Sequence, residues 1–141
     1  MLFVKVGGIR EANRKLISSL GLTESVVQFE RIADVAPFYN AADLFVFPSY
    51  YEGFGYPAAE AMASGCPVVA ADSSSVTEVV GGGGVLFQPF DVVALREIVA
   101  QRLSDLVGNG GLVAKGLEQV KKFDWMTCAE LTLSVYETLL R

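Results

Sequence analysis

Two glutamates flank a glycine-rich turn in the middle of the chain, and their type and spacing could serve chemistry. Residues 49–65 read SYYEGFGYPAAEAMASG, with Glu52 and Glu60 on either side of the Gly-Phe-Gly turn at residues 53–55. The two glycines allow φ > 0 and a close backbone approach to a ligand, and Pro57 suits the first helical position. We therefore expect a strand-to-helix loop whose free amides and positive dipole end favour a phosphate group.

Each carboxylate could hold hydroxyl groups. Glu60, in or next to the first helical turn, can accept two vicinal hydroxyls such as those of a ribose, and Glu52 can meet a second polyol. Two other interpretations stay open on spacing alone. Glu52 could be a solvated loop residue and Glu60 a charge that stabilises the helix dipole. Two acids could also serve a glycoside hydrolase, whose carboxyl groups stand about 5–10 Å apart across the substrate.

Composition restricts the chemistry further. A chain of 141 residues with 52% hydrophobic residues fits one compact domain. The absence of histidine removes imidazole bases, His-type zinc sites and Ser-His-Asp catalysis. A net charge of −5 and a pI near 4.7 argue against a nucleic-acid partner. Cys66 and Cys128 form no metal-type or redox-type pair, and we expect both to be small core residues.

The elements that must position the loop alternate along the chain. Apolar runs predict strands at 2–6, 26–30, 43–48, 67–72 and 84–89, and helical patterns lie at about 11–20, 35–41, 57–64 and 75–80. Strands without polar alternation are typical of a parallel sheet covered on both faces. The sequence therefore predicts a doubly wound α/β fold, in which residues 49–56 lie at the ligand-binding carboxyl edge of the sheet.

The last third of the chain has a helical pattern. A helix is expected at 91–106 with Asp91 as its cap, then a break at residues 108–111, a helix to about Lys121 and a closing helix from Trp125. The glycines at residues 81–84 are expected to form a mobile turn between a helix and a strand. No apolar run is long enough to span a membrane and no leader is evident, which favours a cytoplasmic protein.

One stripe of the closing helix is apolar. Cys128, Leu131, Val135 and Leu139 follow one another at helical spacing. The stripe could pack in the core of this domain, or it could be an exposed patch that favours self-association.

The central region resembles a known family. YNAADLFVFPSYYEGFGYPAAEAMASGCPVVAADSSSVTEVVGGGGVLFQPFD is similar to the signature region of retaining nucleotide-sugar glycosyltransferases of the GT-B fold, in particular bacterial mannosyltransferases of polysaccharide assembly. The resemblance runs almost from end to end, and its Glu-x7-Glu pattern with the intervening Gly-Phe-Gly is highly specific. It implies a Rossmann-like carboxy-terminal donor-binding domain with extra carboxy-terminal helices.

The resemblance assigns roles to the loop. Glu52 would bind hydroxyls of the donor sugar, and Glu60 would hold the ribose. The amides of Gly53, Phe54 and Gly55 would meet the sugar and the distal phosphate.

The resemblance also implies the nucleotide and the mechanism. Ile32 would line the nucleobase, and Asp34 could accept from a guanine edge, which favours GDP-mannose as the donor. The implied reaction is front-face: the acceptor hydroxyl attacks on the side from which the phosphate leaves, and that phosphate takes its proton. No metal and no cofactor besides the nucleotide sugar are implied, and no Asp-x-Asp pair occurs.

The chain departs from the family's pattern at its beginning. Complete members carry an amino-terminal acceptor domain and a first strand and helix with an arginine and a lysine for the diphosphate, and residues 1–141 contain none of these. We therefore interpret the chain as one incomplete donor-binding domain with little activity alone. The saccharide or lipid-linked acceptor would bind through the missing half, and the full-length enzyme could associate with a membrane.

Two further functions stay open beside the leading one. The chain could be a non-catalytic nucleotide-sugar binding module. It could also be part of a related GT-B enzyme, such as a sugar-nucleotide epimerase or a phosphorylase, although the lack of histidine argues against these.

Overall fold

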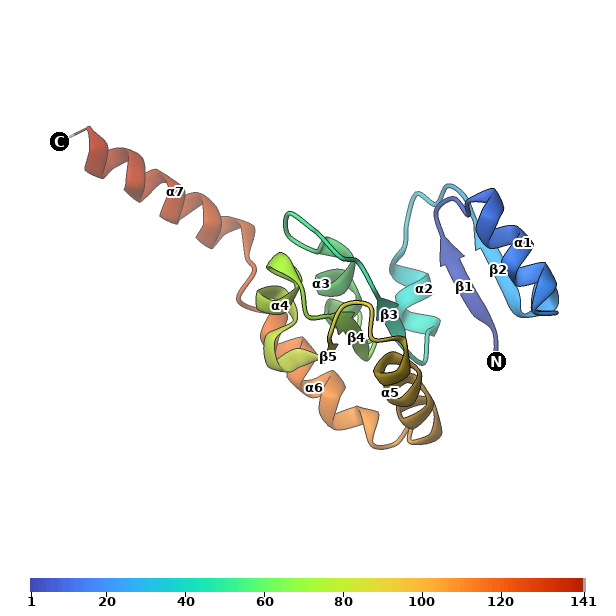
Figure 1. Cartoon of the computed structure of the whole chain (residues 1–141). Helices are drawn as coiled ribbons and strands as arrows, with labels where there is room; N and C mark the ends of the chain where they lie inside the picture. The colour runs from blue at the N-terminus through green and yellow to red at the C-terminus, as the bar shows by residue number, and fades with distance from the viewer. Residues whose placement is uncertain (141) are drawn as a thin grey trace. The chain divides into compact units, whose positions relative to one another are not determined.

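The computed structural model describes residues 1–140. Figure 1 shows the order of the elements along the chain, which forms two compact units, residues 1–35 and the chain from Ala36 onward. Each unit is described by itself.

The first unit is a short β-α-β segment. It contains β1 (Phe3–Val6), α1 (Glu11–Ser19), the 3₁₀ turn η1 (Thr23–Ser25) and β2 (Val26–Phe29). The two strands are parallel, with Phe3 opposite Val26 and Val6 opposite Phe29. Arg14 of α1 donates to the side chain of Gln28 on β2 at 2.6 Å, which ties the crossover helix to the strand that follows it.

The second unit is built on a parallel sheet with a fully buried central strand. Its order is β3 (Phe45–Phe47), β4 (Val68–Ala71) and β5 (Val85–Phe87). Phe45 lies opposite Val68, and Val69 lies opposite Val85. The helical elements are α2 (Ala36–Ala41), α3 (Tyr56–Ala63), α4 (Ser74–Val80), the 3₁₀ turn η2 (Gly81–Gly83), α5 (Val92–Ser104), α6 (Asn109–Val120) and α7 (Trp125–Leu139).

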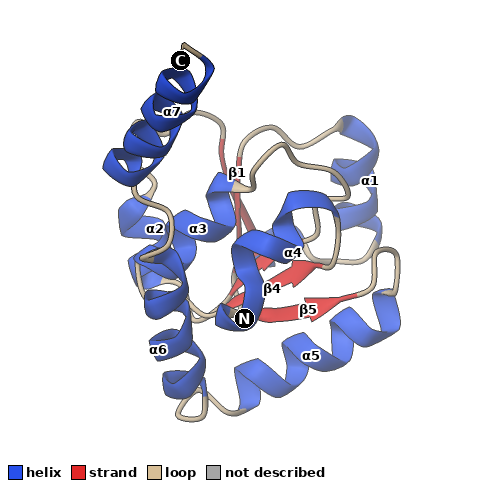
Figure 2. Cartoon of the chain, turned by 90° about the vertical axis from the view of Figure 1, so that its left-hand side faces the viewer, coloured by secondary structure: helices blue, strands red, loops and turns tan. Residues whose placement is uncertain are grey.

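Both faces of β4 are covered by helices. Val68 and Ala70 belong to a core cluster with buried residues of α3 and α4, whereas Val69 and Ala71 cluster with Phe87 beneath α5. Figure 2 shows the helices around β4 and β5. Because alternate side chains of one strand meet helices on opposite faces, an unbroken apolar run such as PVVAA is stable at this position. The predicted doubly wound α/β fold is confirmed.

The expected elements are present, with one boundary corrected. The five strands and the helices lie within a few residues of their predicted ranges, and Asp91 caps α5 by accepting from the amide of Ala94 at 2.9 Å. The predicted break at residues 108–111 lies a few residues earlier, at 105–108, because α6 begins at Asn109 and contains Gly110 and Gly111. Asn109 is buried and its side-chain amide donates to the carbonyl of Arg102, so tertiary contacts override the low helix propensity of glycine here.

The glycines at residues 81–84 connect α4 to β5 as predicted, and one of them, Gly83, is packed into the core. Gly83 is buried, and a Cβ at this position would lie 2.9 Å from Met62 Sδ and 3.0 Å from Gly116 Cα. The glycines therefore allow η2 to approach α6 more closely than any side chain would permit.

The closing helix exposes its apolar stripe. Every residue of α7 is exposed, including Leu131 at 63% and Leu139 at 77%. The interpretation of the stripe as core is therefore wrong for this chain. The stripe is exposed, and the self-association that it would favour stays a prediction. Cys66 is buried as predicted, but Cys128 is exposed, which corrects its assignment to the core. Within residues 1–140, no helix is long and apolar enough to cross a membrane.

Candidate functional site

The predicted loop connects β3 to α3 at the carboxyl edge of the second unit's sheet. Gly55 is the N-cap of α3 and adopts φ 101°, a left-handed conformation that favours glycine, and Pro57 is the second residue of the helix. Gly55 is buried, and a Cβ there would lie 3.4 Å from Val76 Cγ2. No side chain caps α3. Pro57 has no N–H, and the amides of Ala58 and Ala59 donate to the carbonyl of Gly55 at 3.0 and 3.4 Å, so the phosphate seat at this helix start stays a prediction.

The two glycines of the loop differ in their role. Gly55 adopts the positive φ that glycine allows, whereas Gly53 does not. A Cβ at Gly53 would meet nothing within 4 Å. Gly53 thus leaves open space beside the backbone, which a bound molecule could approach.

Phe54 anchors the loop through its side chain. Its ring lies 4.7 Å from the ring of Tyr56 and 5.3 Å, edge to face, from that of Phe123, and it packs against the main core cluster. The backbone of Phe54 is thereby held between two glycines while its ring is withdrawn from solvent. This arrangement is compatible with the predicted contacts between the amides of residues 53–55 and a ligand, which stay a prediction.

Glu52 is held by hydroxyl groups. Its carboxylate Oε1 accepts from the Ser49 hydroxyl at 2.6 Å, and Glu52 is half-buried. The hydroxyls of Ser74 and Ser75, at the start of α4, bond to the Glu52 backbone. The sequence reasoning missed these serines. The sequence does place them at the same edge as the loop, because the run SSS follows the buried strand β4 after one residue, Asp72.

Glu60 lies on α3 as its fifth residue, just beyond the first turn, and is exposed. Its Oε2 accepts from the hydroxyl of Tyr39 on α2 at 3.3 Å. Burial of Tyr39 and the neighbouring Glu60 carboxylate both raise the pKa of the Tyr39 hydroxyl above its ordinary value. Tyr39 therefore stays protonated and remains a donor to Glu60.

The remaining predicted residues belong to the other unit. Ile32 is half-buried and Asp34 exposed, and both follow β2 in the first unit. The structure thus brings Glu52, the amides of residues 53–55 and Glu60 together on one connection of the second unit. It does not place them relative to Ile32 and Asp34.

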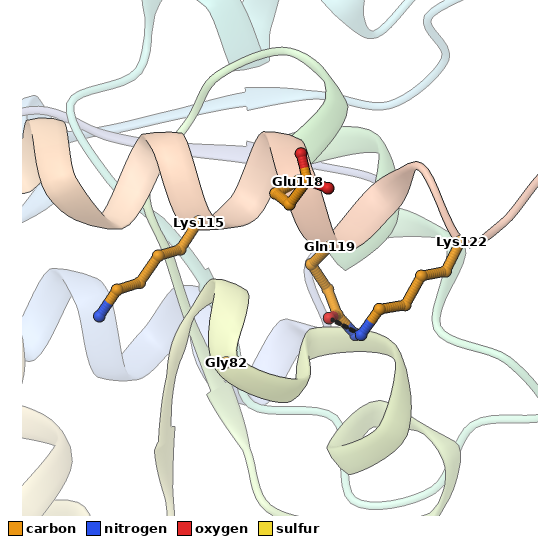
Figure 3. A pocket seen from close by; sticks show the side chains of 5 residues that line it. All are labelled: Gly82, Lys115, Glu118, Gln119 and Lys122. Carbon is orange, nitrogen blue, oxygen red and sulfur yellow. Dashed lines mark hydrogen bonds between the residues drawn. The ribbon is translucent and has the colours of Figure 1, made fainter.

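One hollow in the second unit lies away from this loop. Its volume is about 350 Å³, and Figure 3 shows its lining residues, Gly82, Lys115, Glu118, Gln119 and Lys122, where η2 faces α6. Gln119 donates to the carbonyls of Glu78 and Val79 and so caps the last turn of α4. Its side-chain oxygen accepts from Lys122. Because η2 precedes β5, this hollow lies at the amino edge of the sheet.

A smaller hollow of about 150 Å³ lies at the carboxyl edge. It is lined mainly by apolar residues at or just after the ends of the three strands, including Pro48, Tyr50, Phe87 and Phe90. Among residues 1–140, no three acidic or cysteine side chains are grouped so that they could hold a metal ion.

Comparison with known proteins adds independent findings. A family described as glycosyl transferases group 1 matches residues 2–105. The O-antigen chain mannosyltransferase B of Escherichia coli is 42% identical over 106 residues, which are 75% of this chain and 28% of that protein. The chain therefore spans about a quarter of the length of this relative.

Solved structures agree with the fold. Sucrose-phosphate synthase from Thermosynechococcus elongatus superposes with a TM-score of 0.82 at 32% identity, over 97% of this chain and 38% of that one. Anabaena HepE in complex with UDP-glucose superposes with a TM-score of 0.84 at 26% identity, over 97% of this chain and 41% of that one.

Proposed function

This chain belongs to the glycosyl transferases of group 1, and from that premise we propose that it is the donor-binding part of a retaining glycosyltransferase that uses GDP-mannose. The name of the Escherichia coli relative, a mannosyltransferase, supports mannose as the sugar. The bound UDP-glucose in HepE supports a nucleotide sugar as the class of donor.

One observation carries the proposal. The connection from β3 to α3 places an oriented carboxylate, a run of backbone amides, an uncapped helix start and a second carboxylate in sequence from Glu52 to Glu60. A nucleotide sugar presents groups of matching chemistry in the same order: sugar hydroxyls, a diphosphate and a ribose diol. Carboxylates accept from hydroxyls, whereas amides and a helix start favour phosphate oxygens.

Each part of the loop then has a task. Glu52 accepts from hydroxyls of the sugar and Glu60 from the ribose. The amides of Gly53, Phe54 and Gly55 donate to the sugar and the distal phosphate, where negative charge grows as the bond to the sugar breaks. Glu52 thus orients the donor and is not assigned as a proton-transfer base.

The chemical step follows from this charge distribution. The bond between the anomeric carbon and the phosphate oxygen breaks, and the acceptor oxygen forms its bond on the same face. The proton of the acceptor hydroxyl passes to the departing phosphate. The chain contains no histidine, and this route requires none, because orientation and charge stabilisation lower the barrier.

The first unit supplies the base-binding part of the proposal. Ile32 packs against or bonds the nucleobase through its backbone, and Asp34 accepts from the guanine edge. The acceptor and the cations for the diphosphate come from segments beyond residues 1–141.

Calorimetry of the purified chain with GDP-mannose, UDP-glucose and an ADP-sugar tests donor binding. We expect GDP-mannose to bind most tightly, Glu60→Gln to weaken all three ligands, and Asp34→Ala to remove the preference for GDP. Glu97→Gln, which removes an exposed charge from α5, is the control and should change nothing. Failure of all three nucleotide sugars to bind would contradict the proposal.

A transfer assay separates an enzyme from a binding module. With GDP-mannose and a lipid-linked acceptor, we expect little turnover by the chain alone and turnover once the amino-terminal half is supplied. Saturable binding without transfer, even with that half present, would instead assign a non-catalytic nucleotide-sugar module.

A further inference from the structure

Three consecutive serines at the start of α4 bond to the backbone of the loop that carries Glu52. The Ser73 hydroxyl donates to the carbonyl of Tyr50. The Ser74 hydroxyl accepts from the amide of Glu52 at 3.1 Å and donates to its carbonyl at 2.9 Å. The Ser75 hydroxyl donates to the same carbonyl at 2.9 Å. Both backbone polar groups of Glu52 are therefore satisfied by side chains that lie 22 and 23 positions further along the chain.

The conformation of Ser74 is unusual. Its φ is 47°, in the left-handed region that residues other than glycine rarely adopt. Such a conformation persists only where surrounding contacts determine it. At Ser74, the two hydrogen bonds with the backbone of Glu52 are contacts that hold this conformation.

A fourth hydroxyl acts on the carboxylate itself. Ser49, which lies in the same loop two residues after the end of β3, donates to Oε1 of Glu52 at 2.6 Å. This bond engages one carboxylate oxygen, so Oε2 remains to accept from a ligand. Glu52 is thus fixed at its backbone by α4 and at its side chain by the end of β3.

We propose that Ser49, Ser74 and Ser75 are positioning residues that set the direction of the Glu52 carboxylate toward the donor sugar. The inference rests on the proposed function, because it assigns Glu52 to the sugar. A carboxylate on a free loop would have to be ordered when the ligand binds, whereas this one is ordered beforehand. The serines themselves need not touch the ligand.

The decisive comparison is between a nucleotide sugar and the free nucleotide. Glu52 meets only the sugar, so loss of its positioning should weaken GDP-mannose and spare GDP. For Ser49→Ala and Ser75→Ala, we expect affinity for GDP-mannose to fall about 3- to 10-fold, as for the loss of one ordinary hydrogen bond, because each serine acts on the ligand only through Glu52. Affinity for GDP should stay within about twofold of wild type.

Matched variants separate positioning from a general loss of structure. Ser75→Thr keeps the hydroxyl and should restore most of the affinity. Ser74→Gly removes the hydroxyl without straining the backbone, because glycine adopts a φ of 47° readily. Ser104→Ala is the control, since its hydroxyl bonds only the carbonyl of Gln101 in α5. In a double-mutant cycle with Glu52→Gln, the effect of Ser75→Ala on the affinity for GDP-mannose should shrink, because Ser75 acts through the Glu52 carboxylate, which the first substitution has already removed.

The outcomes distinguish this inference from the proposed function. If wild type binds neither GDP-mannose nor UDP-glucose, the proposed function fails and the inference falls with it. If wild type binds but the serine variants weaken GDP and GDP-mannose equally, or leave both unchanged, only the positioning role is overturned. Full additivity in the cycle with Glu52→Gln would overturn it as well.

Discussion

The hydroxyl of Tyr39 donates to Oε2 of Glu60 at 3.3 Å and so joins α2 to α3 behind the loop. The Tyr39 ring is itself fixed, because it packs edge to face on Phe45 of β3 with ring centroids 5.2 Å apart. The second glutamate of the pair is thereby supported by a hydroxyl, as Glu52 is by Ser49.

Removal of this hydroxyl should weaken donor binding. In Tyr39→Phe the ring packing remains but the Glu60 carboxylate loses its fixed donor, so we expect affinity for a nucleotide sugar to fall about 2- to 5-fold, as for one ordinary hydrogen bond. Calorimetry measures the change. Tyr136→Phe on the exposed α7 is the control, and an equal loss in both variants would contradict the assigned role.

Tyr39 should also make stability depend on alkaline pH. Burial, followed by the Glu60 carboxylate, raises its pKa in the folded chain, whereas the unfolded chain titrates near 10. The unfolded state therefore loses its proton first, and the stability that favours the protonated hydroxyl is complete below about pH 10 and is lost as pH rises above it. Denaturant unfolding at pH 8 to 11 should show a steeper decline for wild type than for Tyr39→Phe. Parallel curves would rule this out.

Gly55 and Gly53 should respond differently to alanine. At Gly55 the left-handed φ and the approach of Val76 predict that Gly55→Ala lowers the free energy of unfolding by about 1–2 kcal/mol. Gly53 has neither constraint, so Gly53→Ala should stay within about 0.5 kcal/mol of wild type. Urea titration of both variants checks this, and similar losses at the two positions would contradict the backbone geometry.

Gly83 and Gly82 form a second matched pair. A Cβ at Gly83 would lie 2.9 Å from Met62 Sδ and 3.0 Å from the Gly116 backbone, whereas one at Gly82 would meet nothing within 4 Å. We expect Gly83→Ala to cost about 1–3 kcal/mol, since η2 and α6 must move apart. Gly82→Ala should change stability by about 0.5 kcal/mol at most. Thermal unfolding distinguishes the two, and equal melting temperatures would show that the contact is not rigid.

The exposed stripe of α7 should promote self-association. Leu131 and Leu133 are similarly exposed, at 63% and 57%, but two positions on a helix point in nearly opposite directions. Leu131 lies in the stripe with Val135 and Leu139, so Leu131→Glu should shift light scattering at high concentration toward a monomer. Leu133→Glu should have little effect. A wild-type chain that stays monomeric at every concentration would refute the prediction.

The sequence predicted the elements well because each of them carries a local signal. PVVAAD has no polar alternation, and this indicated a strand buried on both faces, which β4 is. Asp91 before an apolar helical pattern indicated a cap. The sequence was less accurate where local signals compete with packing. The Gly-Asn-Gly-Gly run at residues 108–111 suggested a break, but the break lies at 105–108, because the buried Asn109 and the packing of α6 hold Gly110 and Gly111 in a helix.

By itself, the sequence determined the doubly wound fold, the edge at which the glutamate loop lies, and the family. The alternation of strands with helices, the unbroken apolar runs and the Glu-x7-Glu spacing are all properties of residues close together in the chain. Only the tertiary structure decided which groups hold the glutamates. Ser74 and Ser75 reach Glu52 across 22 and 23 positions, and Tyr39 reaches Glu60 across 21. Hydrogen bonds between residues so far apart depend on how β3, β4 and their helices pack, and no local pattern encodes that distance.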